Sequence, residues 1–177
     1  MRVILIGSTG ILGSEILKAC AAINIEVTSL GRQNNQYHLN IEDPSSYHIL
    51  NTLEPGPDCA VINCAAVTNV DVCERPSPAI SNAMLFWIRY MSNTCKFTGS
   101  RLVHISSDYV FGGTRQDIPY NISDPHCPVN KYGELKSAAE EIIITSGAEY
   151  QIYRTAANFS ICSKSDKDFA YRALLAL

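Results

Sequence analysis

The sequence predicts an α/β fold, a doubly wound parallel sheet with helices on both faces. Short apolar runs rich in branched residues alternate with longer stretches of helical period, which is the pattern of repeated strand-helix-strand units. Runs such as Val3–Ile6 are apolar at every position. They lack the alternation of a strand with one face in water, so we expect helices on both sides of the sheet. At 177 residues, one well-buried domain over residues 1–177 is expected.

The expected elements follow one another along the whole chain. The strands are Val3–Ile6, Glu26–Leu30, a weak one at Tyr37–Leu39, Cys59–Asn63, Leu102–Ser106 and Tyr150–Tyr153. The helices between them are Ile11–Ala22, Pro44–Leu53, Pro78–Lys96 and Val129–Ser146. Proline is tolerated in the first turn of a helix, which fits the two helices that begin at proline. A last apolar segment, from about Asp166 to Leu177, predicts a helix that ends without a cap, as in an interrupted protein.

Composition and charge exclude several classes of protein. A formal net charge of −3 gives a nucleic acid or an anionic membrane no basic surface to bind. Met1 leads directly into the first apolar run, without the layout of a signal peptide, and no apolar stretch is long enough to cross a membrane. We therefore expect a cytoplasmic protein. The 7 cysteines include no Cys-x-x-Cys pair, so reduced thiols, several of them in the core, are expected and no metal site.

A glycine-rich motif follows the first strand. Gly7-Ser8-Thr9-Gly10-Ile11-Leu12-Gly13 opens the first predicted helix. Glycines at such a turn let the backbone approach a pyrophosphate, whose charge is met by amides at the helix N-terminus. The motif predicts a Rossmann-type NAD(P) site contacted by Gly7, Thr9, Gly10, Ile11, Leu12 and Gly13.

The residues after the second strand bear on the choice of cofactor. That strand ends Ser29-Leu30-Gly31-Arg32, and no acidic residue stands where NAD-selective proteins hold the ribose hydroxyls. The Arg32 guanidinium could pair with a 2′-phosphate instead. NADPH is therefore the expected cofactor, although NADH remains possible.

Three residues form a candidate catalytic group. Tyr132 and Lys136 lie four positions apart in a predicted helix and so project from one face, while Ser107 lies just past the predicted strand Leu102–Ser106. A nearby ammonium group is expected to lower the pKa of the phenol and make Tyr132 a usable general acid for a carbonyl oxygen. The Ser107 hydroxyl would hydrogen-bond the same oxygen. A Tyr-x-x-x-Lys pair is common by chance, so the prediction depends on its conjunction with the glycine motif and the serine.

Four longer motifs carry a resemblance to a known family. They are Asn63-Cys64-Ala65-Ala66-Val67-Thr68-Asn69-Val70-Asp71-Val72-Cys73-Glu74, Ser106-Ser107-Asp108-Tyr109-Val110-Phe111-Gly112-Gly113, Pro128-Val129-Asn130-Lys131-Tyr132-Gly133-Glu134-Leu135-Lys136, and Arg154-Thr155. In this order they resemble the dTDP-4-dehydrorhamnose reductases, within the extended short-chain dehydrogenase/reductases. The resemblance runs over nearly the whole chain.

The resemblance implies hydride transfer from NADPH to C4 of a dTDP-4-keto-6-deoxyhexose, in nucleotide-sugar and dTDP-rhamnose biosynthesis. It assigns catalysis to Ser107, Tyr132 and Lys136, with the last two also beside the cofactor. By the same resemblance Ala65, Ala66 and Thr68 lie near the nicotinamide ribose. Asn40 and Ile41 match an Asp-hydrophobic pair that approaches the adenine, and the Asn removes a charge there.

Two departures from the family pattern limit the expectation. Ala156-Ala157-Asn158 follows Arg154-Thr155 where the family has a small residue and a tryptophan, which leaves the sugar open. The family's C-terminal substrate lobe is absent from these 177 residues, so we expect this chain alone to be poorly active or inactive. The uncovered apolar residues of the last segment would favour a homo-oligomer.

Three other functions occur among proteins with similar motifs. A nucleotide-sugar epimerase shares the Ser, Tyr and Lys and stays open. A dehydratase would need glutamate at position 109, where this chain has Tyr109. A non-catalytic NAD(P)-binding subunit, such as the regulatory subunit of methionine adenosyltransferase, also stays open because it resembles these reductases.

Overall fold

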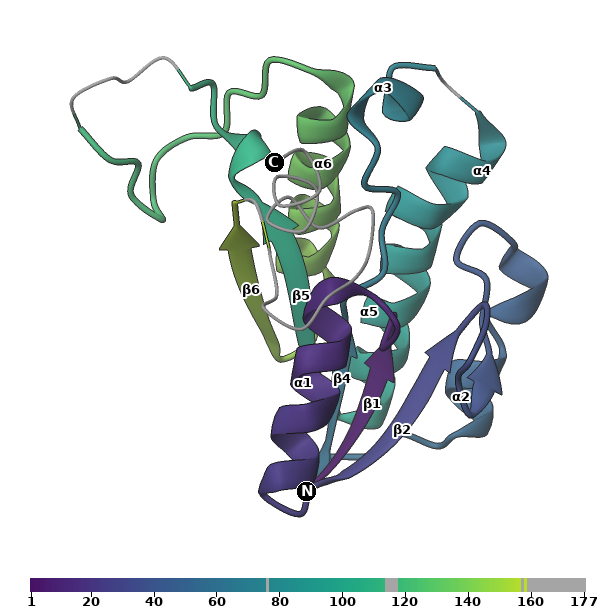
Figure 1. Ribbon diagram of the computed structural model, residues 1–177. Helices are drawn as coiled ribbons and strands as arrows, with labels where there is room; N and C mark the ends of the chain where they lie inside the picture. Colours follow the sequence, from purple (N-terminus) through teal and green to yellow (C-terminus); the bar gives the residue numbers. More distant parts are fainter. Residues whose placement is uncertain (76, 114–117, 157, 159–177) are drawn as a thin grey trace, which may run out of the picture.

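The computed structural model describes residues 1–75, 77–113, 118–156 and 158. A parallel sheet in the order β3-β2-β1-β4-β5-β6 forms its centre (Figure 1). The strands are β1 (Arg2–Ile6), β2 (Glu26–Gly31), β3 (Tyr37–His38), β4 (Cys59–Asn63), β5 (Arg101–Ser107) and β6 (Tyr150–Thr155). This is the strand order of the Rossmann fold, which confirms the predicted fold class and its six strands.

Helices cover both faces of the sheet. On one face α1 (Ile11–Ala22) packs over β1 and β2, with Val3, Leu5 and Cys20 at the centre of the contact. The opposite face is covered by α2 (Ile49–Thr52), α5 (Trp87–Thr98) and α6 (Lys131–Ser146) (Figure 1). The apolar strands are thus covered on both sides, as their lack of alternation predicted.

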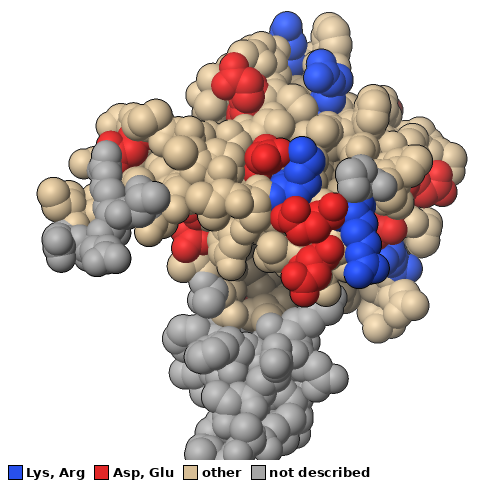
Figure 2. All heavy atoms as spheres, turned by 90° about the horizontal axis from the view of Figure 1, so that it is seen from above, with Lys and Arg blue, Asp and Glu red and all other residues tan. Residues whose placement is uncertain are grey.

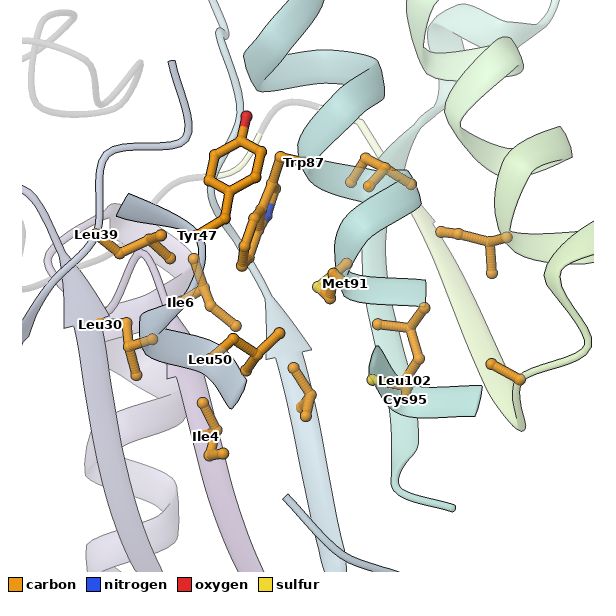
Figure 3. Close-up of a cluster of buried hydrophobic side chains, with 14 of the residues drawn as sticks. Ile4, Ile6, Leu30, Leu39, Tyr47, Leu50, Trp87, Met91, Cys95 and Leu102 are labelled. Atoms are coloured by element: carbon orange, nitrogen blue, oxygen red, sulfur yellow. The ribbon is translucent and has the colours of Figure 1, made fainter. Parts of the chain in front are cut away.

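The larger core lies between the sheet and α2, α5 and α6. Trp87 and Leu50 are fully buried there, and the Trp87 ring packs edge-on against Tyr47 at a centroid distance of 5.1 Å (Figure 3). Asn63, at the end of β4, is also fully buried and accepts a hydrogen bond from the Trp87 indole at 3.2 Å. The Asn63 amide bonds the His104 ring nitrogen at 3.1 Å and the Ala65 carbonyl at 3.3 Å. One buried amide therefore links β4, β5 and α5.

The expected helix Pro78–Lys96 is wrong in one respect. The structure has α4 (Pro78–Ser81), a π-helical turn η2 (Asn82–Phe86) and then α5. The Asn82 carbonyl also accepts a bond from the Tyr47 hydroxyl, and the Asn82 amide donates to the Glu42 carbonyl. The π-helical turn η2 coincides with these two long-range bonds. The apolar periodicity of residues 78–96 contains no information about them.

Other boundaries differ for local reasons. The expected helix Pro44–Leu53 divides into the 3₁₀ turn η1 (Pro44–Ser46) and α2, and a short unpredicted helix α3 (Val70–Cys73) follows β4. The expected start of α6 at Val129 is two residues early because Asn130 is its N-cap and accepts from the Gly133 amide at 2.8 Å. A further 3₁₀ turn, η3 (Asp108–Val110), follows β5. The segment expected to form a helix from about Asp166 lies outside the described residues.

Among the described residues, no helix is both long and apolar enough to cross a membrane. The described cysteines are free thiols. Four of them are buried: Cys20, Cys59, Cys73 and Cys95.

Candidate active site

The glycine motif forms the turn between β1 and α1 and lies against the turn that follows β4. Gly7 has a left-handed backbone, with φ of 80°, and its Cα lies so near the β4 turn that an added Cβ would be 3.0 Å from the Ala65 nitrogen. A Cβ on Gly13 would lie 2.2 Å from the Gly7 carbonyl oxygen. Both glycines are therefore required by the packing of the turn. Thr9 and Gly10 are exposed where this turn enters α1, and the next two residues, Ile11 and Leu12, are half-buried.

One polar residue beside this turn was missed by sequence reasoning. The buried Ser8 hydroxyl donates to the Asn35 side chain at 2.6 Å, and the Asn35 amide donates to the Gln33 carbonyl. The loop after β2 is thereby fastened to the glycine turn. Asn35 is the residue that the sequence did not identify, because an asparagine in a polar loop is too common to be a signal.

The residues expected to face the adenosine half of the cofactor lie after β2 and β3. Arg32 is exposed and pairs with Glu42 at 3.5 Å. The Asn40 side chain accepts a bond from the Glu42 amide at 3.2 Å, and Ile41 packs against the core. In this structure Arg32 thus has a carboxylate partner that its sequence context did not predict.

The expected ribose-side residues follow β4, next to the glycine turn. Ala65 and Ala66 are half-buried, and Thr68 is exposed. Because β1 and β4 are adjacent strands, their C-terminal turns meet at the point where strand order reverses, which is where ligands bind in folds of this type.

The three candidate catalytic residues come from β5 and α6. Tyr132, in the first turn of α6, packs edge-on against Tyr109 with ring centroids 5.4 Å apart. Burial raises the pKa of Tyr132, and a hydrogen bond with Ser107 partly offsets that increase. The Ser107 hydroxyl also donates to Asp108 at 3.1 Å and accepts from the Tyr109 amide. The structure therefore brings Ser107 and Tyr132 together.

The Lys136 ammonium lies over the ring of Tyr132. It is 6.0 Å from the centre of that ring and donates to the Ile105 carbonyl at 3.0 Å. Burial lowers the pKa of Lys136 to about 8, although the Glu140 carboxylate acts in the opposite direction. The expectation that a cation lowers the phenol pKa is thus wrong for this structure, because burial of Tyr132 dominates. A raised pKa keeps the phenol protonated near neutral pH.

Two close contacts hold the start of α6 in place. The Glu74 carboxylate accepts from the Lys131 amide at 2.8 Å, which joins the turn after α3 to the helix N-terminus. A Cβ on Gly133 would lie 2.2 Å from the Tyr109 carbonyl oxygen, so α6 lies directly against η3 at this point. The helix turn that carries Tyr132 is thereby fixed against the segment that follows Ser107.

A cavity of about 510 Å³ lies next to this group. Asp108 and Tyr109 line it on the side of Ser107, and the stacked rings of Phe111 and Tyr120 line it further away, together with Arg154. Its size and mixed lining fit a small polar molecule with apolar faces. Figure 2 looks down on this end of the sheet and shows acidic and basic side chains interspersed over the coloured surface, rather than one extended patch of a single charge.

A buried ionic network lies below the cavity and was also missed. Glu140, on α6, is fully buried, and the Arg154 guanidinium donates to both of its oxygens, the shortest bond being 2.7 Å. Ser106 donates to the same carboxylate at 2.5 Å, and His126 bonds the guanidinium at 2.8 Å. Arg154 stood in the sequence only as part of a motif, while the partners come from distant positions that no local pattern connects. No cluster of three or more metal-binding side chains occurs in the ranges that the structure describes.

Comparison with known proteins agrees with the geometry. A model of the RmlD substrate-binding domain family matches residues 1–175. The chain belongs to this family. A dTDP-4-dehydrorhamnose reductase from Mycolicibacterium smegmatis is 30% identical over 155 residues, which are 88% of this chain and 45% of that protein. The likeness that the motifs predicted is therefore confirmed.

Solved structures of the family are similar over almost the whole chain. A dTDP-4-dehydrorhamnose reductase from Clostridium acetobutylicum superposes with a TM-score of 0.84 at 28% identity, over 99% of this chain and 59% of that one. The enzyme from Bacillus anthracis, solved in complex with NADP, gives 0.83 at 26% identity, over 99% of this chain and 59% of that one. The chain spans about half the length of the curated relatives it matches.

A relative with another role is nearly as similar. Methionine adenosyltransferase 2 subunit beta from Pongo abelii is 29% identical over 157 residues, which are 86% of this chain and 46% of that protein. The relatives of this chain thus have two different functional names.

Proposed function

We propose that the chain is the cofactor-binding and catalytic part of an NADPH-dependent reductase that acts on the 4-keto group of a nucleotide-linked 6-deoxyhexose. The observation that carries the proposal is that Ser107 and Tyr132 interact at the end of β5, next to Asp108 and Tyr109, which line the cavity. A reductase needs a cofactor site, a proton donor and room for a sugar at one place. The family relationship supports the same reaction, since its members include dTDP-4-dehydrorhamnose reductases.

The residues present fit the cofactor. The close packing at Gly7 and Gly13 keeps the turn free of side chains at the start of α1, where helix N-terminal amides favour a pyrophosphate. NADPH, when bound, supplies a hydride to the carbonyl carbon. Arg32 is the residue proposed to hold its 2′-phosphate after leaving Glu42, with Asn40 and Ile41 nearer the adenine. NADH lacks that phosphate and would bind without this contact.

Ser107 and Tyr132 have different roles at the carbonyl oxygen. The Ser107 hydroxyl orients the oxygen by a hydrogen bond, and Tyr132 transfers its phenolic proton to the same oxygen as negative charge develops there. The oxygen becomes the product hydroxyl, and the phenolate left on Tyr132 is stabilised by the Lys136 ammonium over its ring. Lys136 has further N–H groups beyond the one given to Ile105, and these could reach the ribose near Ala65, Ala66 and Thr68.

The test is the Tyr132→Phe variant, assayed with NADPH and a dTDP-4-keto-6-deoxyhexose. Removal of one positioned acid should lower the single-turnover rate by about 10² to 10⁴, while the Kd for NADPH stays within a few fold. Tyr150→Phe is the matched control, because Tyr150 lies exposed at the start of β6, the opposite end of the sheet. A Tyr132→Phe protein that reduces the sugar at a near-normal rate would contradict the mechanism.

A second candidate is a cofactor-binding regulatory subunit, favoured by the similarity to methionine adenosyltransferase 2 subunit beta. In that case NADPH would bind with normal affinity, but no keto sugar would be reduced by the wild-type protein in single-turnover conditions. An epimerase would instead return an inverted sugar without net oxidation of NADPH. The same assay, followed by product analysis, separates the three.

A further inference from the structure

Consecutive residues of β5 are joined to one face of α6. The Ile105 carbonyl accepts from Lys136, the Ser106 hydroxyl donates to Glu140, and Ser107 meets Tyr132. The helix residues are spaced by four, so all three contacts fall on one face of α6, although their order along the helix differs from their order along the strand. Glu140 thus makes one of the three contacts that join the end of β5 to α6.

Glu140 is itself held rigidly. The Arg154 guanidinium donates two bonds from Nε and one from Nη2 to its oxygens, at 2.7 to 3.2 Å. Ser106 and Arg154 lie opposite each other in the β5–β6 register, so both strands bind one carboxylate. Arg154 also bonds the Ile122 carbonyl and His126, which lie in the segment that borders the cavity. A fully buried carboxylate with this set of partners has a fixed position.

We propose that Glu140 is a positioning residue of the reductase site: anchored by Arg154, it holds β5 against α6 and thereby sets Ser107 and Lys136 relative to Tyr132. The proposal rests on the proposed function for its catalytic consequence. Its structural part, an influence of Glu140 on Lys136, stands separately. Glu140 is not among the residues that line the cavity, so it acts through Ser106, Lys136 and Arg154, the last of which does line it.

The surroundings of Lys136 make this influence measurable. Cys64 after β4, Cys73 on α3 and His104 on β5 face the same ammonium, in addition to Glu140 on its own helix. Burial lowers the pKa of Lys136 to about 8, and among these neighbours Glu140 has the largest opposing effect. Loss of the Glu140 charge should lower the midpoint by about one unit.

The test is a ¹³C NMR titration of the Lys136 ε-carbon, with Lys136→Arg used for assignment. Glu140→Gln is compared with Glu141→Gln, which removes the same charge from the adjacent exposed position of α6. We expect the Lys136 midpoint to fall by about one unit in Glu140→Gln only. At pH 8 the charged fraction would then fall from about half to about a tenth, and the turnover rate by about fivefold, with little change in KM. Equal midpoints in the two variants would overturn the proposal.

A second variant covers the case in which Glu140→Gln does not fold because Arg154 is left buried and unpaired. Glu140→Gln combined with Arg154→Met removes both charges, and Arg154 is not among the groups that shift the pKa of Lys136. The Lys136 midpoint should again fall, and an unchanged midpoint overturns the proposal. The titration needs neither cofactor nor sugar. It can therefore fail while the reductase activity is found, or succeed while that activity is absent.

Discussion

A methyl group added at Gly133 should move Tyr132 away from Ser107. The new Cβ would lie 2.2 Å from the Tyr109 carbonyl oxygen and 2.9 Å from the Pro128 Cβ. Ordinary contact begins at 3.4 Å, so α6 and η3 must separate by roughly 1 Å in a closely packed region. Gly133 follows Tyr132, and Tyr109 lies two residues after Ser107, so the separation falls directly on the Ser107–Tyr132 contact.

The structure gives the expected size of each effect. A misplacement of about 1 Å can cost about 10² in rate, so we expect the single-turnover rate of Gly133→Ala to fall by about that factor. Overpacking costs about 1 to 3 kcal/mol. Alanine regains about 1 kcal/mol of helix propensity relative to glycine, which leaves a net loss of about 0 to 2 kcal/mol. The rate should thus fall much more than the stability.

Stopped-flow NADPH oxidation measures the single-turnover rate, NADPH titration the Kd for the cofactor, and urea unfolding the stability. Gly56→Ala is the control, since its Cβ would meet nothing closer than 3.6 Å. The Kd for NADPH should change little in either variant, because the glycine turn after β1 is untouched. A Gly133→Ala protein with a rate within about threefold of wild type would show that the contact between α6 and η3 does not set the catalytic geometry.

Two further changes test the electrostatics of the site. Glu42→Gln frees Arg32 from its exposed partner. It should tighten NADPH binding by up to about fivefold, since such pairs are worth about 0.2 to 1 kcal/mol. Calorimetry should find NADH binding unchanged, and equal gains for both cofactors would show that Arg32 does not bind the 2′-phosphate. Lys136→Met should be more stable than wild type at pH 7, and the difference should shrink as pH rises from about 8 towards 10.5, because the folded protein releases the Lys136 proton before the unfolded chain does. Urea unfolding at several pH values checks the second expectation, which a constant difference would contradict.

The fold could be predicted from the sequence because its signals are local. Uninterrupted apolar runs mark the buried strands, and α1 and β4 have the bounds that the pattern predicted. The glycine turn and the Ser107, Tyr132 and Lys136 group were also found, since each rests on a short motif beside a predicted strand or helix. The expected roles of these residues in binding and catalysis remain predictions.

What the sequence could not provide depends on residues far apart in the chain. The Glu140 network joins positions 106, 126, 140 and 154, and nothing in any one segment indicates that they meet. The pKa of Tyr132 was misjudged for the same reason, because burial is a property of the assembled core. The π-helical turn at Asn82–Phe86 likewise coincides with a bond from Tyr47, on a different segment.

The buried amide of Asn63 has a consequence for how the site fluctuates. Surface turns usually open with little free energy, independently of the core. The turn at Ala65 is different, because its carbonyl is bonded by a side chain that also bonds Trp87 and His104, all fully or almost fully buried. The turn at Ala65, which is proposed to lie next to the nicotinamide ribose, should therefore open only when β4, β5 and α5 separate together. Its hydrogen exchange should follow global unfolding rather than loop motion.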